Sequence, residues 1–349
     1  MFIDIIEKID HEEELTKKDL IYLLSLEDQE GLDLIYKKAD GFRKKYVGDE
    51  VHLRGLIEFS NYCRKNCFYC GIRRGNLKAR RYRMAIEEIL ESVAAAEKLG
   101  YRTVVLQSGE DLYYTAEKLV DLVRRIKRQS DIAITLSIGE RPREVYQQLY
   151  EAGADRFLIR FETSNSKLYE ELHPDSDFGE RMIILKWLKE IGYQVGSGVM
   201  IGLPGQTIED LAADILKFKE LDLDMVGVGP YICHEGTPLR GNKNGTVEMT
   251  FKVIALTRLV TRYAHIPATT ALATLRQSDG REKALQLGAN VVMPNVTPVK
   301  YRALYELYPA KVCIQEGSEQ CCDCIHGRIL SIGRLISKDY GHSLALHSQ

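Results

Sequence analysis

The chain has 349 residues and a formal net charge of -2, and 45% of its residues are hydrophobic. This length and composition can bury a large core, and the balanced charge argues against a nucleic-acid partner. No apolar run approaches the ~20 residues that a membrane span needs. The charged start, Met1 to Asp10, does not read as a signal peptide. We therefore expect a soluble, cytoplasmic monomer with no membrane partner.

Residues 1–48 predict short amphipathic helices that cover one end of the next domain. Thr16 and Asp19 have the spacing of a capping box in front of an apolar run that begins at Leu20. From Val51 the pattern changes to short apolar runs rich in β-branched residues, each followed by a stretch that is mostly long enough for a helix.

This alternation gives eight candidate strands. They are Val51 to Phe59, Thr103 to Leu106, Ile132 to Leu136, Phe157 to Phe161, Val195 to Ile201, Met225 to Ile232, Pro267 to Leu272 and Val291 to Pro294. Strands buried on both faces read as nearly unbroken apolar runs, and eight strand-helix units over about 250 residues fit a closed barrel. An open doubly wound sheet is the alternative, but no strand reads as an exposed edge. The predicted fold class is α/β, a complete (βα)8 TIM-type barrel over residues 49–308 with an N-terminal helical extension (1–48) and a C-terminal cysteine-bearing tail (309–349).

Three cysteines follow the first strand in the spacing C-x3-C-x2-C, namely Cys63, Cys67 and Cys70. They can wrap one loop around a metal site, but a structural zinc site wants a fourth protein ligand. Iron-sulfur clusters are held by thiolates at such short spacings, and a cubane with three protein ligands leaves one iron open to an outside molecule. A zinc knuckle with a distant fourth ligand, or three unrelated buried thiols, are the alternatives. Eight cysteines in two groups plus Cys233 suit metal ligation in a reducing compartment better than disulfides.

Polar residues follow several strands, at the end where barrel active sites lie. They include Gln107, Ser108, Ser137, Thr269 and Thr270. In the fourth strand Arg156, Arg160 and Glu162 share one face, because side chains alternate along a strand. Burying three charges against helices would cost several kcal/mol each unless they are paired, so we expect them to line a wet lumen that holds a ligand. By the same alternation Arg54 and Glu58 share a face of the first strand. An internal ion network that only holds the barrel together is the alternative.

The strand-helix pattern ends after Tyr308. Beyond it Cys313, Cys321 and Cys324 form a second three-thiol set with the spacing C-x7-C-x2-C, and Cys322 is an extra thiol. This density of cysteines predicts a second metal site. The alternative is an accessory site that is irrelevant to turnover.

The cysteine spacing, with the aromatic Tyr69 before the third cysteine, resembles the signature of the radical S-adenosylmethionine (SAM) enzymes. Over nearly the whole chain the sequence resembles the HydE family of FeFe-hydrogenase maturases, within the group that includes biotin synthase and methylornithine synthase. The stretches that carry the resemblance are Ile57 to Gly71, Val105 to Asp111, Glu151 to Arg156, Gly202 to Thr207, Ile266 to Thr270 and Gly288 to Asn295. The tail spacing also looks like that family's auxiliary cluster.

The resemblance implies a complete barrel around a long cavity, with a 4Fe-4S cluster on the first three cysteines and SAM beside it. The implied SAM contacts are Tyr69, Gln107, Ser108, Ser137, Glu162, Arg181 and Tyr305. Glu162 would take the ammonium group of SAM, and Arg181 its carboxylate region. The implied substrate and anion pocket comprises Arg54, Arg156, Arg160, Thr269, Thr270 and Met293. A second cluster, 2Fe-2S or 4Fe-4S, would use Cys313, Cys321 and Cys324, and Cys322 departs from that pattern.

The implied reaction is reductive cleavage of SAM to a 5'-deoxyadenosyl radical. The radical would act on an iron carbonyl-cyanide complex bound to cysteine, a precursor of the hydrogenase di-iron cofactor, with transient contacts to other maturases. A radical SAM enzyme of amino-acid or cofactor biosynthesis, similar to methylornithine synthase or biotin synthase, is the second hypothesis. A biotin-type enzyme would need ligands for a sacrificial cluster in the lumen, where Arg54 is the one candidate. A non-catalytic iron-sulfur carrier is the third, but carriers do not need so large a barrel.

Overall fold

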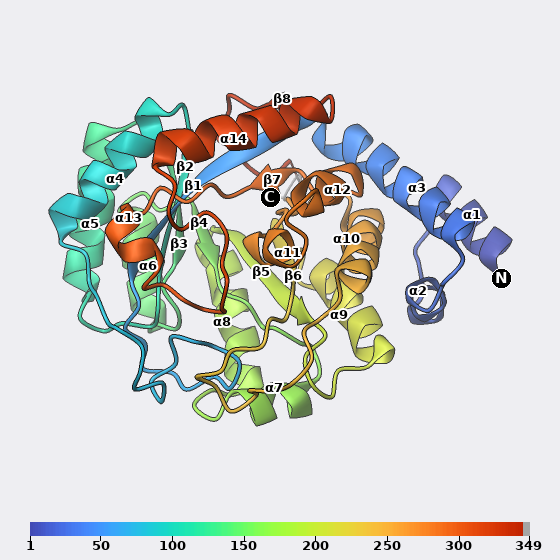
Figure 1. The fold of residues 1–349 in the computed structure, drawn as a ribbon, viewed down its shortest axis with the longest axis horizontal. Coiled ribbons are helices and arrows are strands. Elements are labelled where there is room, and N and C mark those ends of the chain that lie inside the picture. The colour runs from blue at the N-terminus through green and yellow to red at the C-terminus, as the bar shows by residue number, and fades with distance from the viewer. Residues whose placement is uncertain (345–349) are drawn as a thin grey trace.

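The fold is an α/β assembly in which parallel strands occupy the middle and helices surround them (Figure 1). The computed structural model describes residues 1–344. The strands are β1 (Glu50–Ser60), β2 (Thr103–Ser108), β3 (Ala133–Ser137), β4 (Arg156–Leu158), β5 (Gln194–Ile201), β6 (Met225–Pro230), β7 (Val291–Val292) and β8 (Leu335–Ile336). The helices are α1 (Phe2–Asp10), α2 (Lys17–Leu24), α3 (Gln29–Val47), α4 (Ile86–Lys98), α5 (Ala116–Gln129), α6 (Arg143–Glu151), α7 (Ser166–Leu172), α8 (Phe178–Ile191), α9 (Ile208–Glu220), α10 (Val247–Thr261), α11 (Thr270–Leu275), α12 (Gly280–Gln286), α13 (Val299–Arg302) and α14 (Ser318–Ser331).

The sheet runs in the order β6-β5-β4-β3-β2-β1-β7, and every pairing is parallel. β1 is its longest strand, and every residue from Val51 to Ser60 is buried. Parallel strands need crossover connections, and helices fill them here, which explains why the strands read as unbroken apolar runs. Because all these strands point the same way, the loops after them gather at one end of the sheet. The cysteine loop after β1 is one of them.

The predicted ring of eight strands is only partly matched, since seven strands lie in this path. Between β6 and β7 the pairing among the described residues consists of two isolated parallel bridges, Met225 with His265 and Pro267 with Val291. The predicted strand from Pro267 to Leu272 is wrong beyond Pro267. The Thr269 side chain accepts a hydrogen bond from the Leu272 amide, and helix α11 begins there. A threonine cap before alanine and leucine favours a helix over a strand.

β4 is also shorter than predicted, because it ends at Leu158 rather than Phe161. Beyond it the backbone of Glu162 has a φ of 62° and forms an isolated bridge with Val199. A non-glycine residue in this left-handed region is uncommon and is held there by its surroundings. The chain after β4 therefore places Glu162 beyond the carboxyl end of that strand in a constrained conformation.

The N-terminal residues form three helices, as predicted, and lie at one side of the sheet (Figure 1). The capping box of Thr16 and Asp19 is confirmed: the Thr16 hydroxyl accepts from the Asp19 amide at 3.2 Å, and the Asp19 carboxylate accepts from the Thr16 amide at 2.9 Å. Apolar residues of α1 and α2, such as Ile5 and Leu20, are buried in the core, and α2 and α3 pack on α9 and α10.

The tail returns to the sheet, which the sequence did not predict. Its cysteines lie before and on α14, and β8 then pairs with the start of β1, Leu335 opposite Glu50 and Ile336 opposite Val51. Among residues 1–344 no helix has the length and apolar character needed to cross a membrane.

Candidate functional site

A cavity of about 320 Å³ opens at the carboxyl ends of the strands. Among its lining residues are many of those predicted from the sequence: Cys63, Cys67, Tyr69, Cys70, Gln107, Ser108, Ser137, Arg160, Glu162, Arg181, Thr269 and Tyr305. They come from the ends of β1 to β4, from α8 and from loops far apart in the chain. The structure therefore brings the three thiols and most of the expected polar residues to one place.

The cysteine loop is fixed by backbone contacts on both of its sides. The Arg81 guanidinium donates to the carbonyl oxygens of Asn61 at 2.6 Å and of Ile72 and Arg73 at 2.7 Å. Gly109 allows the loop after β2 to approach, because a Cβ there would lie 2.2 Å from the Tyr62 carbonyl oxygen. A bulkier residue at position 109 would push the cysteine loop away from the strand ends.

The three thiols line one cavity and are the ligand type that iron-sulfur clusters use. Burial raises the pKa of Cys63, Cys67 and Cys70, that of Cys67 to about 12, so the thiol form is favoured near pH 7 and binding of a metal would displace those protons. Within residues 1–344 no three His, Cys, Asp or Glu side chains converge tightly enough for one metal ion. The Glu110 amide lies 3.4 Å from the Cys63 sulfur and donates to it. Three thiols around an open cavity, with an amide aimed at sulfur, fit a multi-iron group and leave room for its ligand.

Glu162 is a buried carboxylate with unused hydrogen-bonding capacity. Its Oε2 lies 3.1 Å from the Arg160 guanidinium but makes no hydrogen bond among the described residues. Burial raises the pKa of this carboxyl, while Arg160 and Arg181 oppose the shift. An acceptor left without hydrogen bonds in a buried site costs about 1–3 kcal/mol, so a cationic ligand with N–H groups would be stabilising there.

Arg181 is held by an acidic residue that the sequence analysis did not assign to the site. Its guanidinium donates to Glu140 at 2.7 Å, and Lys65 of the cysteine loop lies 2.5 Å from the other Glu140 oxygen. Burial alone would raise the pKa of Glu140, but Arg181 and Lys65 outweigh it and lower that pKa. The position of Glu140, at the carboxyl end of β3, was a usable signal for it. Lys65 gave no such signal.

A histidine that was also missed fixes the predicted aromatic residue. The Tyr69 hydroxyl lies 2.7 Å from His173 Nε2, and His173 Nδ1 lies 2.7 Å from the Tyr169 carbonyl oxygen. Burial lowers the pKa of His173 to about 4, so the ring is neutral near pH 7. Nδ1 therefore carries the proton that it donates to the carbonyl, and Nε2 accepts from Tyr69. His173 lies in a loop about a hundred residues away from Tyr69, and no local pattern marked it.

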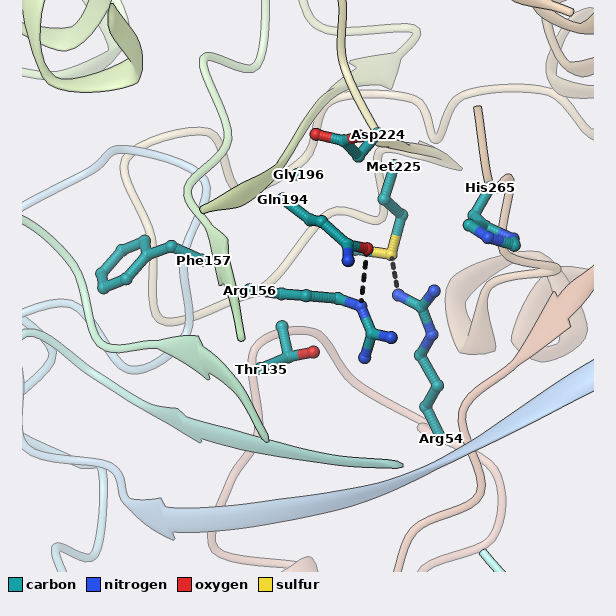
Figure 2. Close-up of a pocket in the computed structure, with 9 residues that line it drawn as sticks. All are labelled: Arg54, Thr135, Arg156, Phe157, Gln194, Gly196, Asp224, Met225 and His265. Carbon is teal, nitrogen blue, oxygen red and sulfur yellow. Dashed lines mark hydrogen bonds between the residues drawn. The ribbon is translucent and has the colours of Figure 1, made fainter. Parts of the chain in front are cut away.

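Two of the predicted substrate residues lie elsewhere. Arg54 and Arg156 line a separate pocket of about 10 Å³ near the amino ends of the strands, where their guanidinium groups lie beside each other (Figure 2). Arg54 donates to the Met225 sulfur and to the Gly341 carbonyl oxygen, both at 3.0 Å. Arg156 donates to the Tyr340 carbonyl oxygen at 2.7 Å. The structure therefore does not bring these two arginines into the cavity that Arg160 lines.

The reason is the distance along the chain. Arg156 and Arg160 both line interior pockets, but four residues of extended chain span up to about 13 Å. The two arginines therefore face different ends of the same interior.

Two further substrate candidates lie in a third small pocket of about 10 Å³. Thr270 and Met293 line it together with Cys313 and Cys321 of the tail. Cys324, the third thiol of that set, is exposed on α14. The structure thus brings two tail thiols together and leaves the third at the surface.

Cys322 faces a different direction from its neighbours. Its sulfur lies 3.5 Å from His326 Nε2 and contacts the Tyr101 hydroxyl, which is buried. It is therefore engaged away from Cys313 and Cys321.

The comparisons with known proteins agree with this arrangement. Residues 57–218 match the model of the radical SAM superfamily. The chain is 50% identical over 338 residues to the [FeFe] hydrogenase maturase subunit HydE of Thermotoga maritima, covering 97% of this chain and 96% of that protein. It is 35% identical to the 3-methylornithine synthase of Methanosarcina acetivorans, over 82% of this chain and 81% of that protein. Among solved structures, a methylornithine synthase (PylB) superposes with a TM-score of 0.83 at 30% identity, covering 95% of this chain and 96% of that one.

Proposed function

Because this chain belongs to the HydE family of radical SAM [FeFe]-hydrogenase maturases, we propose that it generates a 5'-deoxyadenosyl radical that acts on a cysteine-bound iron carbonyl-cyanide precursor. The observation that carries the proposal is a single cavity of about 320 Å³ lined by three loop thiols and by a carboxylate with an unused oxygen. A non-catalytic carrier would not need a cavity of this size beside its cluster.

Cys63, Cys67 and Cys70 hold the 4Fe-4S cluster in this proposal. The bound cluster supplies the electron that breaks a carbon-sulfur bond of SAM. The chain's own contribution is to hold the loop in place through Arg81 and the glycine at position 109. The Glu110 amide, donating to Cys63, stabilises negative charge on that sulfur.

Glu162 accepts hydrogen bonds from the ammonium group of SAM, and Arg181 lies at its carboxylate. The Glu140 and Lys65 contacts support this assignment, since they fix the Arg181 guanidinium beside the cysteine loop. The remaining SAM contacts are assigned to residues that line the same cavity: Tyr69, Gln107, Ser108, Ser137 and Tyr305. With His173 neutral, the Tyr69 hydroxyl stays a donor to Nε2 and keeps its ring in one orientation.

The substrate assignment is narrower than the sequence implied. Arg160 and Thr269 line the cavity and are kept as substrate contacts, with Arg160 as the cation for an anionic complex. Thr270 and Met293 border a neighbouring pocket, and Arg54 and Arg156 belong to the far end of the interior. We do not assign these four residues to the reacting part of the substrate.

The finer architecture also remains a proposal. The ring closes into a complete barrel over residues 49–308, supported by the two bridges that link β6 to β7 through His265 and Pro267. Residues 1–48 form an N-terminal extension, and residues 309–349 form a tail. A second iron-sulfur cluster on Cys313, Cys321 and Cys324 is supported by the approach of the first two thiols, and it requires movement of the third. The protein acts as a monomer that contacts other maturases transiently.

In vitro maturation tests the function. Anaerobically reconstituted protein with dithionite and SAM should yield 5'-deoxyadenosine or an adenosylated product, and adding the protein to apo-hydrogenase with the other maturases should raise hydrogenase activity. If SAM stays intact with and without candidate substrates, every hypothesis that makes this protein a radical SAM enzyme is rejected. If SAM is cleaved but maturation does not depend on this protein, the amino-acid or cofactor biosynthesis alternative replaces the proposal.

A further inference from the structure

A groove of about 780 Å³ lies on the surface beside the cysteine loop. Its walls are the second half of that loop, residues 71–80, the loop after β6, residues 234–240, and residues 303–306. Ile72 is buried and lines both this groove and the cavity that holds the three thiols. Gly71, which follows the ligand Cys70 directly, also lines the groove. The surface therefore comes within a few bonds of the proposed cluster.

The segment that forms this wall has an unusual charge. Between Phe59 and Ile86 the chain contains eight arginine and lysine residues and no aspartate or glutamate, although the whole protein has a net charge of -2. Most of these cations are paired inside the protein, for example Lys65 with Glu140 and Arg83 with Asp111. The cations that are not paired in this way are the ones that a partner protein could contact.

Three cations at the groove have side chains that make no ion pair or hydrogen bond within residues 1–344: Lys78, Arg80 and Arg240. Each of them is exposed, and Leu77, which lines the same groove, is 93% exposed. The acidic residues of the groove are Glu235 and Glu306, and Glu306 already lies 3.5 Å from His234. The free charge of the groove is thus positive, around an exposed apolar residue, as is common at protein interfaces.

We propose that this groove, centred on Lys78, Arg80 and Arg240, docks an acidic protein that carries one electron, such as a ferredoxin. The proposal rests on the proposed function, because reductive cleavage of SAM consumes an electron that no residue of the chain can supply. The carrier loses one electron, and SAM gains it as its carbon-sulfur bond breaks to methionine and the 5'-deoxyadenosyl radical. One docking event is therefore needed for each SAM that is consumed. Positive charge at the entry point speeds encounter with an acidic partner.

The test compares two triple variants that change charge equally. In one, Lys78→Glu, Arg80→Glu and Arg240→Glu reverse the groove. In the matched control, Lys17→Glu, Lys18→Glu and Lys37→Glu reverse three exposed lysines of α2 and α3 whose side chains also make no ion pair or hydrogen bond within the described residues. Titration of the cluster-loaded protein with an oxidised bacterial ferredoxin gives the dissociation constant at low and high salt. SAM cleavage is then driven by reduced ferredoxin or by dithionite.

We expect the groove variant to raise the dissociation constant about ten-fold or more at low salt and to erase most of its salt dependence, because interface charges are screened within a Debye length. Ferredoxin-driven cleavage should fall with it, while dithionite-driven cleavage and the control variant stay as in the parent protein. An unchanged dissociation constant, or an equal loss in the control, would overturn the docking site. So would a groove variant that altered only self-association in sedimentation, because the groove would then belong to a second copy of the chain.

The two proposals fail in different ways. If dithionite cannot drive SAM cleavage in the parent protein, the proposed function fails, and the ferredoxin dissociation constants still decide the docking site. If dithionite drives cleavage but the parent protein does not bind ferredoxin at low salt, the docking site fails alone.

Discussion

The two cysteine groups of this protein have similar spacings but different surroundings. Cys63, Cys67 and Cys70 lie on one loop, and all three line the same cavity. In the tail, Cys313 and Cys321 line a small inner pocket, while Cys324 is exposed on α14. The sequence spacing alone does not distinguish these cases. What separates them is whether a loop or a helix carries the thiols, because a helix fixes the directions of its side chains and a loop can wrap around a ligand.

An arginine anchors each cysteine group. Arg81 donates to the carbonyl oxygens of the first loop, and Arg302 donates to the Thr297 and Glu316 carbonyl oxygens, both at 2.6 Å, and to the Ser318 hydroxyl at 2.9 Å. The first anchor binds the carbonyl oxygen of Ile72, which lines the cavity, and the second binds Glu316 and Ser318 of the tail. The comparison therefore predicts that the first group is essential for SAM chemistry and that the second is not.

The largest expected effect is on SAM cleavage itself. Cys67→Ser should abolish the formation of 5'-deoxyadenosine, because serine does not replace a thiolate ligand of iron, whereas Cys321→Ser should leave cleavage little changed. Chromatography of reactions with dithionite and SAM measures both. Cys233→Ser, which removes a thiol outside both groups, is the matched control. Equal loss of cleavage in the Cys67 and Cys321 variants would break the distinction.

The anchors should give the next largest effect. Arg81→Met and Arg302→Met each leave carbonyl oxygens without their donor, at about 1–3 kcal/mol for each buried group, so both should lower the free energy of unfolding. Only Arg81→Met should also lower the iron content of the first site and the rate of SAM cleavage. Thermal denaturation, iron analysis and the cleavage assay separate the two effects. A variant at Arg302 that loses cleavage while Arg81→Met keeps it would reverse our ranking.

Glu162→Gln should weaken SAM binding about 10- to 100-fold, because it removes one or two charge-assisted hydrogen bonds to SAM. It should not remove the cluster. Equilibrium binding of SAM to the reconstituted protein measures it, with Glu235→Gln at the surface as control. In the parent protein SAM affinity should fall as the pH is lowered through the raised pKa of Glu162, and the variant should lack this dependence. Unaltered affinity in the variant would contradict the role of this carboxylate.

The same substitution should stabilise the ligand-free protein near neutral pH. Because the folded-state pKa of Glu162 lies above its unfolded value, the folded state binds more protons between the two values. Stability therefore falls as the pH rises through that window, and glutamine removes this loss. Denaturant unfolding of both proteins at acid and neutral pH measures the difference in their free energies of unfolding. If the variant is less stable than the parent protein at neutral pH, the charge of Glu162 does not destabilise the ligand-free site.

The smallest effects concern the tail thiols. Cys324→Ser should reduce the iron bound at the second site without changing the free energy of unfolding, because its side chain is exposed. Cys322→Ala should leave the bound iron unchanged and cost about 1 kcal/mol, since the buried sulfur packs against Tyr101 and His326. Iron analysis and unfolding of both variants check this, and iron loss in the Cys322 variant would place that thiol in the cluster.

Sequence reasoning succeeded where the signal was local. The capping box at Thr16 and most strand positions depend on neighbouring residues, and the structure has them as predicted. It failed at Pro267 to Leu272, where an apolar run next to a threonine cap forms a helix. Short apolar runs do not distinguish the two forms.

In the candidate site, too, sequence reasoning found the residues that have a local signal and missed those that do not. The thiols and most of the polar residues at strand ends were found, because the carboxyl ends of parallel strands meet at one edge. His173 and Lys65 were missed because they reach the cavity from loops. The positions of these two side chains at the cavity depend on how α7 and the cysteine loop pack. The spacing of residues in the sequence does not indicate that packing.

The sequence by itself determined the cysteine loop, the alternation of parallel strands and helices and the family to which the chain belongs, because each of these is written in contiguous residues. The tertiary structure alone decided that Arg156 and Arg160, on one face of one strand, serve different ends of the interior. It also decided that Glu162 Oε2 pairs with Arg160 but makes no hydrogen bond among the described residues, while the guanidinium of Arg181 is held by Glu140. The physical reason is that spacing fixes the direction in which a side chain points, whereas its partners depend on which distant segments the packed core brings beside it.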